Sequence, residues 1–176
     1  MAKIAFGMNV SLDGYVDHDR FAPDTTLFAH WIDHMQQISG CLYGRKIYEL
    51  MRYWENDQPE WGEAERVFAE AWRAQHKWVV SQTLTKVGPN ATLISGDVVA
   101  AVHDLKARQS GEIEVGGPVL AGFLGEHGLI DEYKLYYHPV VLGHGRPFFV
   151  AERPKMRLVG HERFGDDAFR LTYVPQ

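Results

Sequence analysis

The sequence predicts one α/β domain built on a mostly parallel central sheet that helices cover on both faces. Short apolar segments alternate with amphipathic segments through most of the chain, as parallel strands joined by helices do. Twice, at residues 41–53 and 112–127, a strand passes through glycine directly into a helix. A chain of 176 residues buries one core well and is short for two, so we assign residues 1–176 to a single domain.

The first predicted elements are a strand and a helix with clear ends. Residues 3–10 form an apolar strand that stops at Ser11-Leu12-Asp13-Gly14, where aspartate and glycine favour a turn. Apolar residues at helical spacing then run from Leu27 to Ile38, and Asp24 or Thr25 would cap this helix. The same reasoning predicts strands at residues 41–43, 78–81 and 92–94 and helices at residues 47–53, 63–75 and 98–107, the last capped by Asp97.

The last third of the chain repeats this unit and then changes to β-structure. Glycine and proline again follow a strand in the tight turn Gly116-Gly117-Pro118, and Gly128 ends the helix after it. Apolar and more polar residues alternate near the C-terminus, which predicts a strand in an antiparallel pair. The predicted elements are strands at residues 112–115, 133–142 and 169–174 and a helix at residues 119–127.

Composition excludes several classes of function. A net charge of -5 argues against nucleic-acid binding, which needs a basic face. No apolar run is long enough to span a bilayer, and the chain enters its first strand at once, so we expect a cytoplasmic protein without membrane contact. Cys41 is the sole cysteine, which excludes an internal disulfide and a cysteine-rich zinc site.

Three segments place small or donor-rich residues just beyond a strand, where ligands bind in such sheets. They are Gly44-Arg45-Lys46, Ser81-Gln82-Thr83 and Gly116-Gly117-Pro118-Val119. In the third, the missing side chains let a ligand approach the backbone, and the free N–H groups of the following helix favour a phosphate. Arg45 and Lys46 would neutralise more phosphate charge. Together these segments predict an extended, polyanionic nucleotide as the ligand.

Six short motifs follow one another in a fixed order along nearly the whole chain: residues 11–16 (SLDGYV), 44–49 (GRKIYE), 79–84 (VVSQTL), 115–118 (VGGP), 128–133 (GLIDEY) and 139–143 (PVVLG). In this order they resemble the dihydrofolate reductase-like family. Within that family, the chain is similar to the reductase domain of the bacterial bifunctional deaminase-reductase of riboflavin biosynthesis.

The resemblance implies a three-layer αβα fold and a reductase that passes a hydride from NADPH, with NADH as the alternative, to a small pyrimidine- or pterin-like substrate. The first candidate substrate is 5-amino-6-(5-phosphoribosylamino)uracil. The implied cofactor residues are Gly44, Arg45, Lys46, Gly116, Gly117, Pro118 and Val119 around the phosphates, with Ser81 and Thr83 near the adenosine. The implied substrate-side residues are Asn9, Ser11, Asp13 and Trp31. A homodimer is also implied, through the C-terminal strands and the apolar segment at residues 147–150.

The sequence departs from the family pattern at several positions. Ile47 stands where relatives have a phosphate-binding threonine, and Gln82 where they often have an arginine beside the 2′-phosphate. Dihydrofolate reductases carry an acidic residue early in the first helix, where this chain has Thr25-Thr26-Leu27-Phe28. The zinc deaminase signature is missing as well. A stand-alone reductase domain, or a relative with another substrate, is therefore expected.

Other interpretations remain open. Dihydrofolate reductase-type activity is one alternative, and a nucleotide-binding protein without turnover is another. His30 and His34 lie one helical turn apart, as zinc ligands do, but we interpret them as a solvated helix face and predict no metal. For Asp131-Glu132 we favour a structural role through bonds to neighbouring loop N–H groups. No residue can be assigned as the proton donor.

Overall fold

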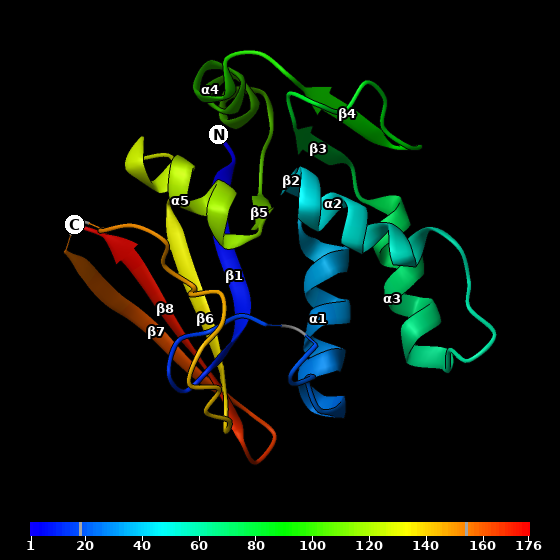
Figure 1. Cartoon of the computed structure of the whole chain (residues 1–176), viewed down its shortest axis with the longest axis vertical. Coiled ribbons are helices and arrows are strands. Elements are labelled where there is room, and N and C mark those ends of the chain that lie inside the picture. Colours follow the sequence, from blue (N-terminus) through cyan, green and yellow to red (C-terminus); the bar gives the residue numbers. More distant parts are fainter. Residues whose placement is uncertain (18, 154) are drawn as a thin grey trace.

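Figure 1 shows the computed structural model of the chain, which describes residues 1–17, 19–153 and 155–176. Within these residues an eight-stranded sheet forms the centre, in the order β4-β3-β2-β5-β1-β6-β8-β7. The strands are β1 (Lys3–Ser11), β2 (Gly40–Gly44), β3 (Lys77–Val80), β4 (Ala91–Ile94), β5 (Glu112–Gly116), β6 (Glu132–His138), β7 (Met156–Phe164) and β8 (Ala168–Pro175). The helices are α1 (Thr25–Gln37), α2 (Arg45–Met51), the short 3₁₀ helix η1 (Arg52–Glu55), α3 (Glu63–Ala74), α4 (Val98–Arg108) and α5 (Pro118–Glu126).

The sheet is mostly parallel, as predicted. β1 lies in the middle and pairs in parallel with β5 and β6, so that Phe6 stands opposite Val115 and Tyr133. β2 pairs in parallel with β5 and β3, and β3 with β4. Among the described strands, β8 alone runs against its neighbours β6 and β7. This confirms the antiparallel strand at the C-terminus.

Helices cover both faces of the sheet and give the three layers that were expected. α4 and α5 pack on one face, where Val102 and Leu124 join apolar side chains of β1 and β5 (Figure 1). α1, α2 and α3 cover the other face, where Met35, Tyr48 and Trp72 pack with side chains of β2 and β3. In the described part of the chain, no helix is both long enough and apolar enough to cross a membrane.

Two helices begin at the caps that the sequence predicted. Asp24 Oδ1 accepts the N–H of Leu27 at 2.8 Å at the start of α1. Asp97 Oδ1 accepts the N–H of Ala100 at 3.0 Å at the start of α4. Each carboxylate satisfies an N–H group that the first turn of a helix leaves without a partner, which explains why the helices start there.

Asp131 and Glu132 have a structural role, as the sequence favoured, but their partners are a strand N–H and lysine side chains rather than loop N–H groups. Asp131 Oδ2 accepts the backbone N–H of Ile4 at 2.7 Å and pairs with Lys106. Glu132 pairs with Lys3 at 2.9 Å. Both carboxylates therefore tie the start of β6 to the start of β1.

Three element predictions need correction. The strand predicted through residue 142 ends at His138, because Pro139 has no N–H for the sheet ladder. The helix predicted at residues 47–53 begins at Arg45 and ends in η1. β7 was not predicted, because most of its side chains are exposed and show no apolar alternation.

The apolar segment at residues 147–150, which was expected to contribute to a dimer, is partly buried and partly exposed. Phe148 is buried, and its ring centroid lies 4.4 Å from that of Phe6 in the core. This part of the segment is therefore held inside the protomer.

Candidate functional site

A cavity of about 610 Å³ lies where β2 and β5 end and α2 and α5 begin. We call it the glycine cavity, because Gly44, Gly116 and Gly117 form its wall together with the first residues of α5. Such an edge is the usual binding place in a parallel sheet, since the strands there give way to diverging helices. The predicted residues that line the cavity are Gly44, Arg45, Lys46, Gly116, Gly117, Pro118 and Val119.

Gly116 at the end of β5 and Gly117 just before α5 are required by the local geometry. A Cβ atom on Gly116 would lie 2.5 Å from the Tyr43 ring, and one on Gly117 would lie 2.7 Å from Ile47. Gly117 also has a φ of +97°, a backbone conformation that side chains disfavour. Pro118 follows as the first residue of α5, so the first turn of this helix, whose N–H groups have no partner within the helix, lies at the cavity.

Cationic side chains complete the fit of this cavity to a polyanionic ligand. Arg45, Lys46 and Arg146 all line it. Arg146 was missed by sequence reasoning, because it lies in the loop between β6 and β7, far from the other residues in the chain. Backbone N–H groups, a helix dipole and three cations are what a pyrophosphate with a further phosphate requires, so the residues present fit a phosphorylated dinucleotide.

Ser81 and Thr83 lie beside this cavity rather than in its lining. The Ser81 hydroxyl accepts the N–H groups of Thr83 and Leu84, at 3.2 and 3.1 Å, and so shapes the turn after β3. Arg45 donates to the Thr83 hydroxyl at 2.9 Å and to Glu49 at 2.8 Å. Ser81 and Thr83 thus hold Arg45 at the rim.

A second cavity, of about 400 Å³, lies between α1, α2 and the sheet. We call it the aromatic cavity, because Phe28, Trp31, Trp54 and other ring side chains line it. It shares Ile47, Gly116 and Gly117 with the glycine cavity. The two cavities therefore adjoin at these three residues.

Two of the four predicted substrate residues reach the aromatic cavity. Asn9 and Trp31 line it, and Trp31 Nε1 donates to Asn9 Oδ1 at 3.3 Å. The same oxygen lies 3.0 Å from His138 Nε2. No described residue accepts a hydrogen bond from the Asn9 amide nitrogen. Its N–H groups are therefore free to donate to a ligand.

Ser11 and Asp13 are not brought to this cavity by the structure. The Ser11 hydroxyl donates to Asp13 Oδ1 at 2.7 Å and lowers the pKa of that carboxyl to about 2. Asp13 also accepts the N–H groups of Leu142 and Gly143, at 3.1 and 2.7 Å. These bonds stabilise the turn after β1 against the loop that follows β6.

Glu114 is a functional candidate that sequence reasoning missed. It is the one acidic side chain among the described residues that line the aromatic cavity. Its Oε1 accepts the N–H of Gly7 at 3.0 Å, and its Oε2 lies 3.2 Å from His34 Nε2. The side chain is only 10% exposed. Its sequence signal was the spacing of Glu112 and Glu114, which places both side chains on one face of β5. This strand lies between two others, and acidic pairs in such a position indicate a functional or charge-paired site.

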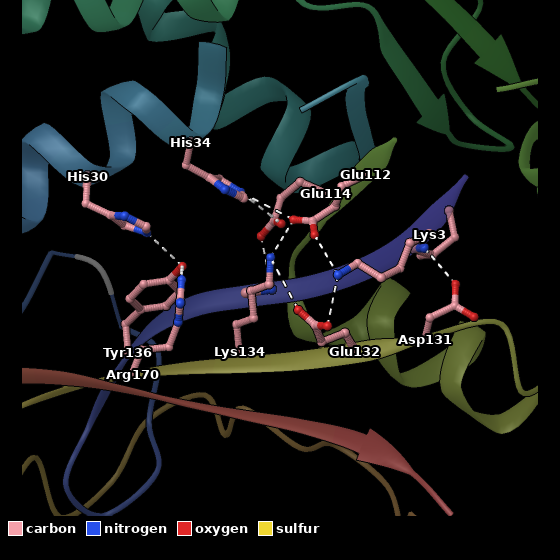
Figure 2. A network of polar contacts seen from close by, with 12 residues as sticks. Lys3, His30, His34, Glu112, Glu114, Asp131, Glu132, Lys134, Tyr136 and Arg170 are labelled. Carbon is pink, nitrogen blue, oxygen red and sulfur yellow. Dashed lines mark hydrogen bonds and ion pairs between the residues drawn. The ribbon is translucent and has the colours of Figure 1, made fainter. Parts of the chain in front are cut away.

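The interpretation of His30 and His34 as a solvated helix face is wrong. Both imidazoles point from α1 toward the sheet, as Figure 2 shows, and His34 is 10% exposed. His30 Nε2 lies 3.0 Å from the Tyr136 hydroxyl, and burial lowers the pKa of His30 to about 4. The opposite side of α1 packs against α3, so two sides of this helix are covered.

A charged cluster lies behind Glu114, on the same face of the sheet (Figure 2). Lys134 lies 2.5 Å and Lys3 3.1 Å from the carboxylate of Glu112. Burial would raise the pKa of Glu112, but hydrogen bonds from both ammonium groups outweigh this effect and lower it. Ligand atoms of His34, Glu112 and Glu114 lie within 4.8 Å of one another, yet these lysines already supply the positive charge that the carboxylates need.

The sequence is similar to a known protein family and to a bacterial protein. A family model described as the RibD C-terminal domain matches residues 2–169. The uncharacterized protein YyaP of Bacillus subtilis (strain 168) is 29% identical over 182 residues, which cover 97% of this chain and 94% of that protein.

Solved structures share the fold. A crystal structure described as that of a riboflavin biosynthesis protein from Shewanella sp. PV-4 aligns with a TM-score of 0.73 and 24% identity, over 100% of this chain and 99% of that one. Dihydrofolate reductase from Enterococcus faecalis, complexed with NADP(H) and RAB-propyl, aligns with a TM-score of 0.67 and 14% identity, over 98% of this chain and 95% of that one. The architecture is therefore dihydrofolate reductase-like.

Proposed function

This chain belongs to the RibD C-terminal domain family, and from that premise we propose that it is a nicotinamide-dependent reductase of a small pyrimidine- or pterin-like substrate. The observation that carries the proposal is that the two cavities adjoin and share Ile47, Gly116 and Gly117 in their walls. A hydride transfer needs its donor and acceptor in contact, and in this proposal the two adjoining cavities bring the cofactor and the substrate together at these residues.

In this proposal the glycine cavity binds the cofactor. The backbone at Gly116 and Gly117 and the first turn of α5 bind the pyrophosphate, and Arg45, Lys46 and Arg146 neutralise its charge. A reduced nicotinamide, when bound, supplies the hydride. Support for a nicotinamide cofactor comes from the family and from the NADP(H)-bound neighbour. Three cations favour NADPH, whose extra phosphate needs such partners, over NADH.

The aromatic cavity binds the substrate in this proposal. A flat ring would pack against Trp31 and Phe28, and the Asn9 amide nitrogen would donate to a ring carbonyl or nitrogen. Riboflavin-type chemistry makes 5-amino-6-(5-phosphoribosylamino)uracil the first substrate to test. One observation favours a second candidate: no lysine or arginine is among the described residues that line this cavity, and a phosphate arm would need one. A phosphate-free pterin or pyrimidine satisfies that condition, and dihydrofolate satisfies it for its pterin ring but not for the two carboxylates of its glutamate tail.

The test is cofactor binding followed by turnover. Calorimetry with NADPH and NADH is expected to show binding, with NADPH the tighter ligand. Loss of the near-ultraviolet absorbance of NADPH is then followed with the phosphoribosylaminouracil, its phosphate-free analogue and dihydrofolate. Oxidation with at least one acceptor is expected. Tight binding without oxidation by any of them would favour a nucleotide-binding protein, and no heat with either cofactor would overturn the proposal.

A further inference from the structure

A reductase of this kind needs one proton for every hydride, and the residues chosen from sequence do not supply it. Resting on the proposed function, we propose that Glu114 donates this proton to the substrate and that His34 returns a proton to Glu114. Glu114 lies on the wall of the aromatic cavity, two residues before Gly116, which lines both cavities. A donor is thus present where hydride and substrate would meet.

The carboxyl group of Glu114 is held in one orientation. One oxygen accepts the backbone N–H of Gly7 at 3.0 Å, and the other lies 3.2 Å from His34 Nε2 (Figure 2). A Cβ on Gly7 would lie 2.8 Å from the first oxygen, so the glycine in β1 leaves the space that the carboxyl group occupies. This fixed position suits a general acid, because proton transfer depends on geometry before it depends on pKa.

The groups around His34 direct it toward Glu114. Glu112 from β5 is also near, with Oε1 3.9 Å from His34 Nε2, but this carboxylate is paired with Lys134 from β6 and Lys3 from β1. Glu114 is therefore the closer and less engaged acid. The other neighbours of His34 are His30, whose ring centroid lies 6.0 Å away, and Trp31 at 5.6 Å, both on α1.

The proposed step balances in atoms and electrons. The hydride brings one proton and two electrons to the carbon of a C=N or C=O bond, where a new C–H bond forms. The π electron pair moves to the nitrogen or oxygen, which takes the proton from the Glu114 carboxyl group. Glu114 is left as a carboxylate and takes a proton from His34. His34 keeps 10% of its side chain exposed and regains a proton from solvent.

The test uses single-turnover oxidation of bound NADPH with the acceptor that the wild type reduces, from the set above. Glu114→Gln keeps an oxygen for the Gly7 N–H and removes the proton. We expect its hydride-transfer rate near pH 7 to fall about 100-fold, with NADPH affinity unchanged within about twofold. Since solvent must then supply the proton, the rate should rise about tenfold for each unit of pH decrease.

Glu132→Gln is the matched control, because Glu132 carries the same group and lies in the same charged cluster, paired with Lys3 and Lys134, outside the cavity lining. Its rate is expected to match the wild type. His34→Gln is the second variant if Glu114→Gln does not fold, and in steady-state assays, which include the return of the proton to Glu114, it should lower kcat by about tenfold or more with a flattened pH profile.

Outcomes for the two proposals are distinguishable. A Glu114→Gln protein with the wild-type rate and pH profile would overturn the role of Glu114 while the reductase proposal stands. A His34→Gln protein with the wild-type rate and pH profile would likewise overturn the return of the proton from His34 to Glu114 and leave the reductase proposal standing. A wild type that binds NADPH but reduces none of the acceptors would remove both proposals together.

Discussion

Gly117 lies so close to Ile47 that a Cβ atom at position 117 would stand 2.7 Å from Cγ1 of Ile47. The φ of +97° at Gly117 adds a second reason for glycine, because L side chains are strained there. The Ile47 side chain packs against Gly116 and Gly117 and so forms the floor under the turn.

Gly117→Ala is therefore expected to lower the free energy of unfolding by about 1–3 kcal/mol, measured by urea denaturation. Part of this loss comes from the contact with Ile47, so a double-mutant cycle with Ile47→Ala should show a coupling of about 0.5 kcal/mol or more. Purely additive effects would assign the loss to φ alone.

Gly117→Asp should also abolish NADPH binding, because a carboxylate would enter the glycine cavity. Unchanged NADPH affinity would show that the turn is only structural.

Patterns formed by residues close together in the sequence predicted much of this architecture. The caps Asp24 and Asp97 and the two strand-glycine-helix units depend on neighbouring residues, and all of them appear in the structure. Parallel pairing follows from the order of the elements, which is visible in the sequence. These features need no knowledge of distant contacts.

The site was less predictable, because its parts come together only in the folded chain. Glu114 binds Gly7 and His34, which are 107 and 80 residues away in the sequence. Arg146 reaches the glycine cavity from a loop with no regular pattern. Ser11 and Asp13 were chosen for their polar groups, and the structure uses those groups to stabilise a turn. Sequence shows which side chains can do chemistry, but not which ones are already engaged.

Arg146 provides a test of the cofactor assignment. Because it is exposed and lines the glycine cavity, Arg146→Ala should weaken NADPH binding by about tenfold, as expected for one charge-assisted contact. The loss should shrink at high salt. Arg157→Ala is the control, since Arg157 is exposed on β7. Calorimetry measures both variants, and equal affinity in the Arg146 and Arg157 variants would place the phosphates elsewhere.

The burial of Lys77 should make the free energy of unfolding rise with pH. It is buried in β3, and its ammonium lies 4.1 Å from the centroid of the Trp72 ring and donates to the Arg73 carbonyl. Burial lowers the pKa of Lys77 from 10.5 to about 8. The folded state therefore binds fewer protons than the unfolded state between these values, and stability contributed by this group increases as pH rises through that window.

Lys77→Met should accordingly raise the free energy of unfolding near pH 7 by about 1 kcal/mol, because it removes a buried charge and keeps the volume. This advantage should shrink above pH 8, where the wild-type lysine loses its proton in the folded state. Urea denaturation near pH 7 and near pH 10 measures both effects, with Lys86→Met at an exposed position as the control. A variant that is less stable at both pH values would mean that the contact with Trp72 outweighs the cost of burial.

β7 is a free edge of the sheet, where a second copy of the chain could pair. β7 ends the strand order, and its Leu158 and Val159 are 48% and 46% exposed. An edge strand with exposed apolar side chains favours pairing with another chain. We propose a homodimer through this edge, which light scattering after size exclusion should detect at micromolar concentration. Val159→Lys should shift the protein to monomer, whereas Val141→Lys, at a loop position that is 71% exposed, should not. A wild-type monomer, or dissociation by both variants alike, would move the interface away from β7.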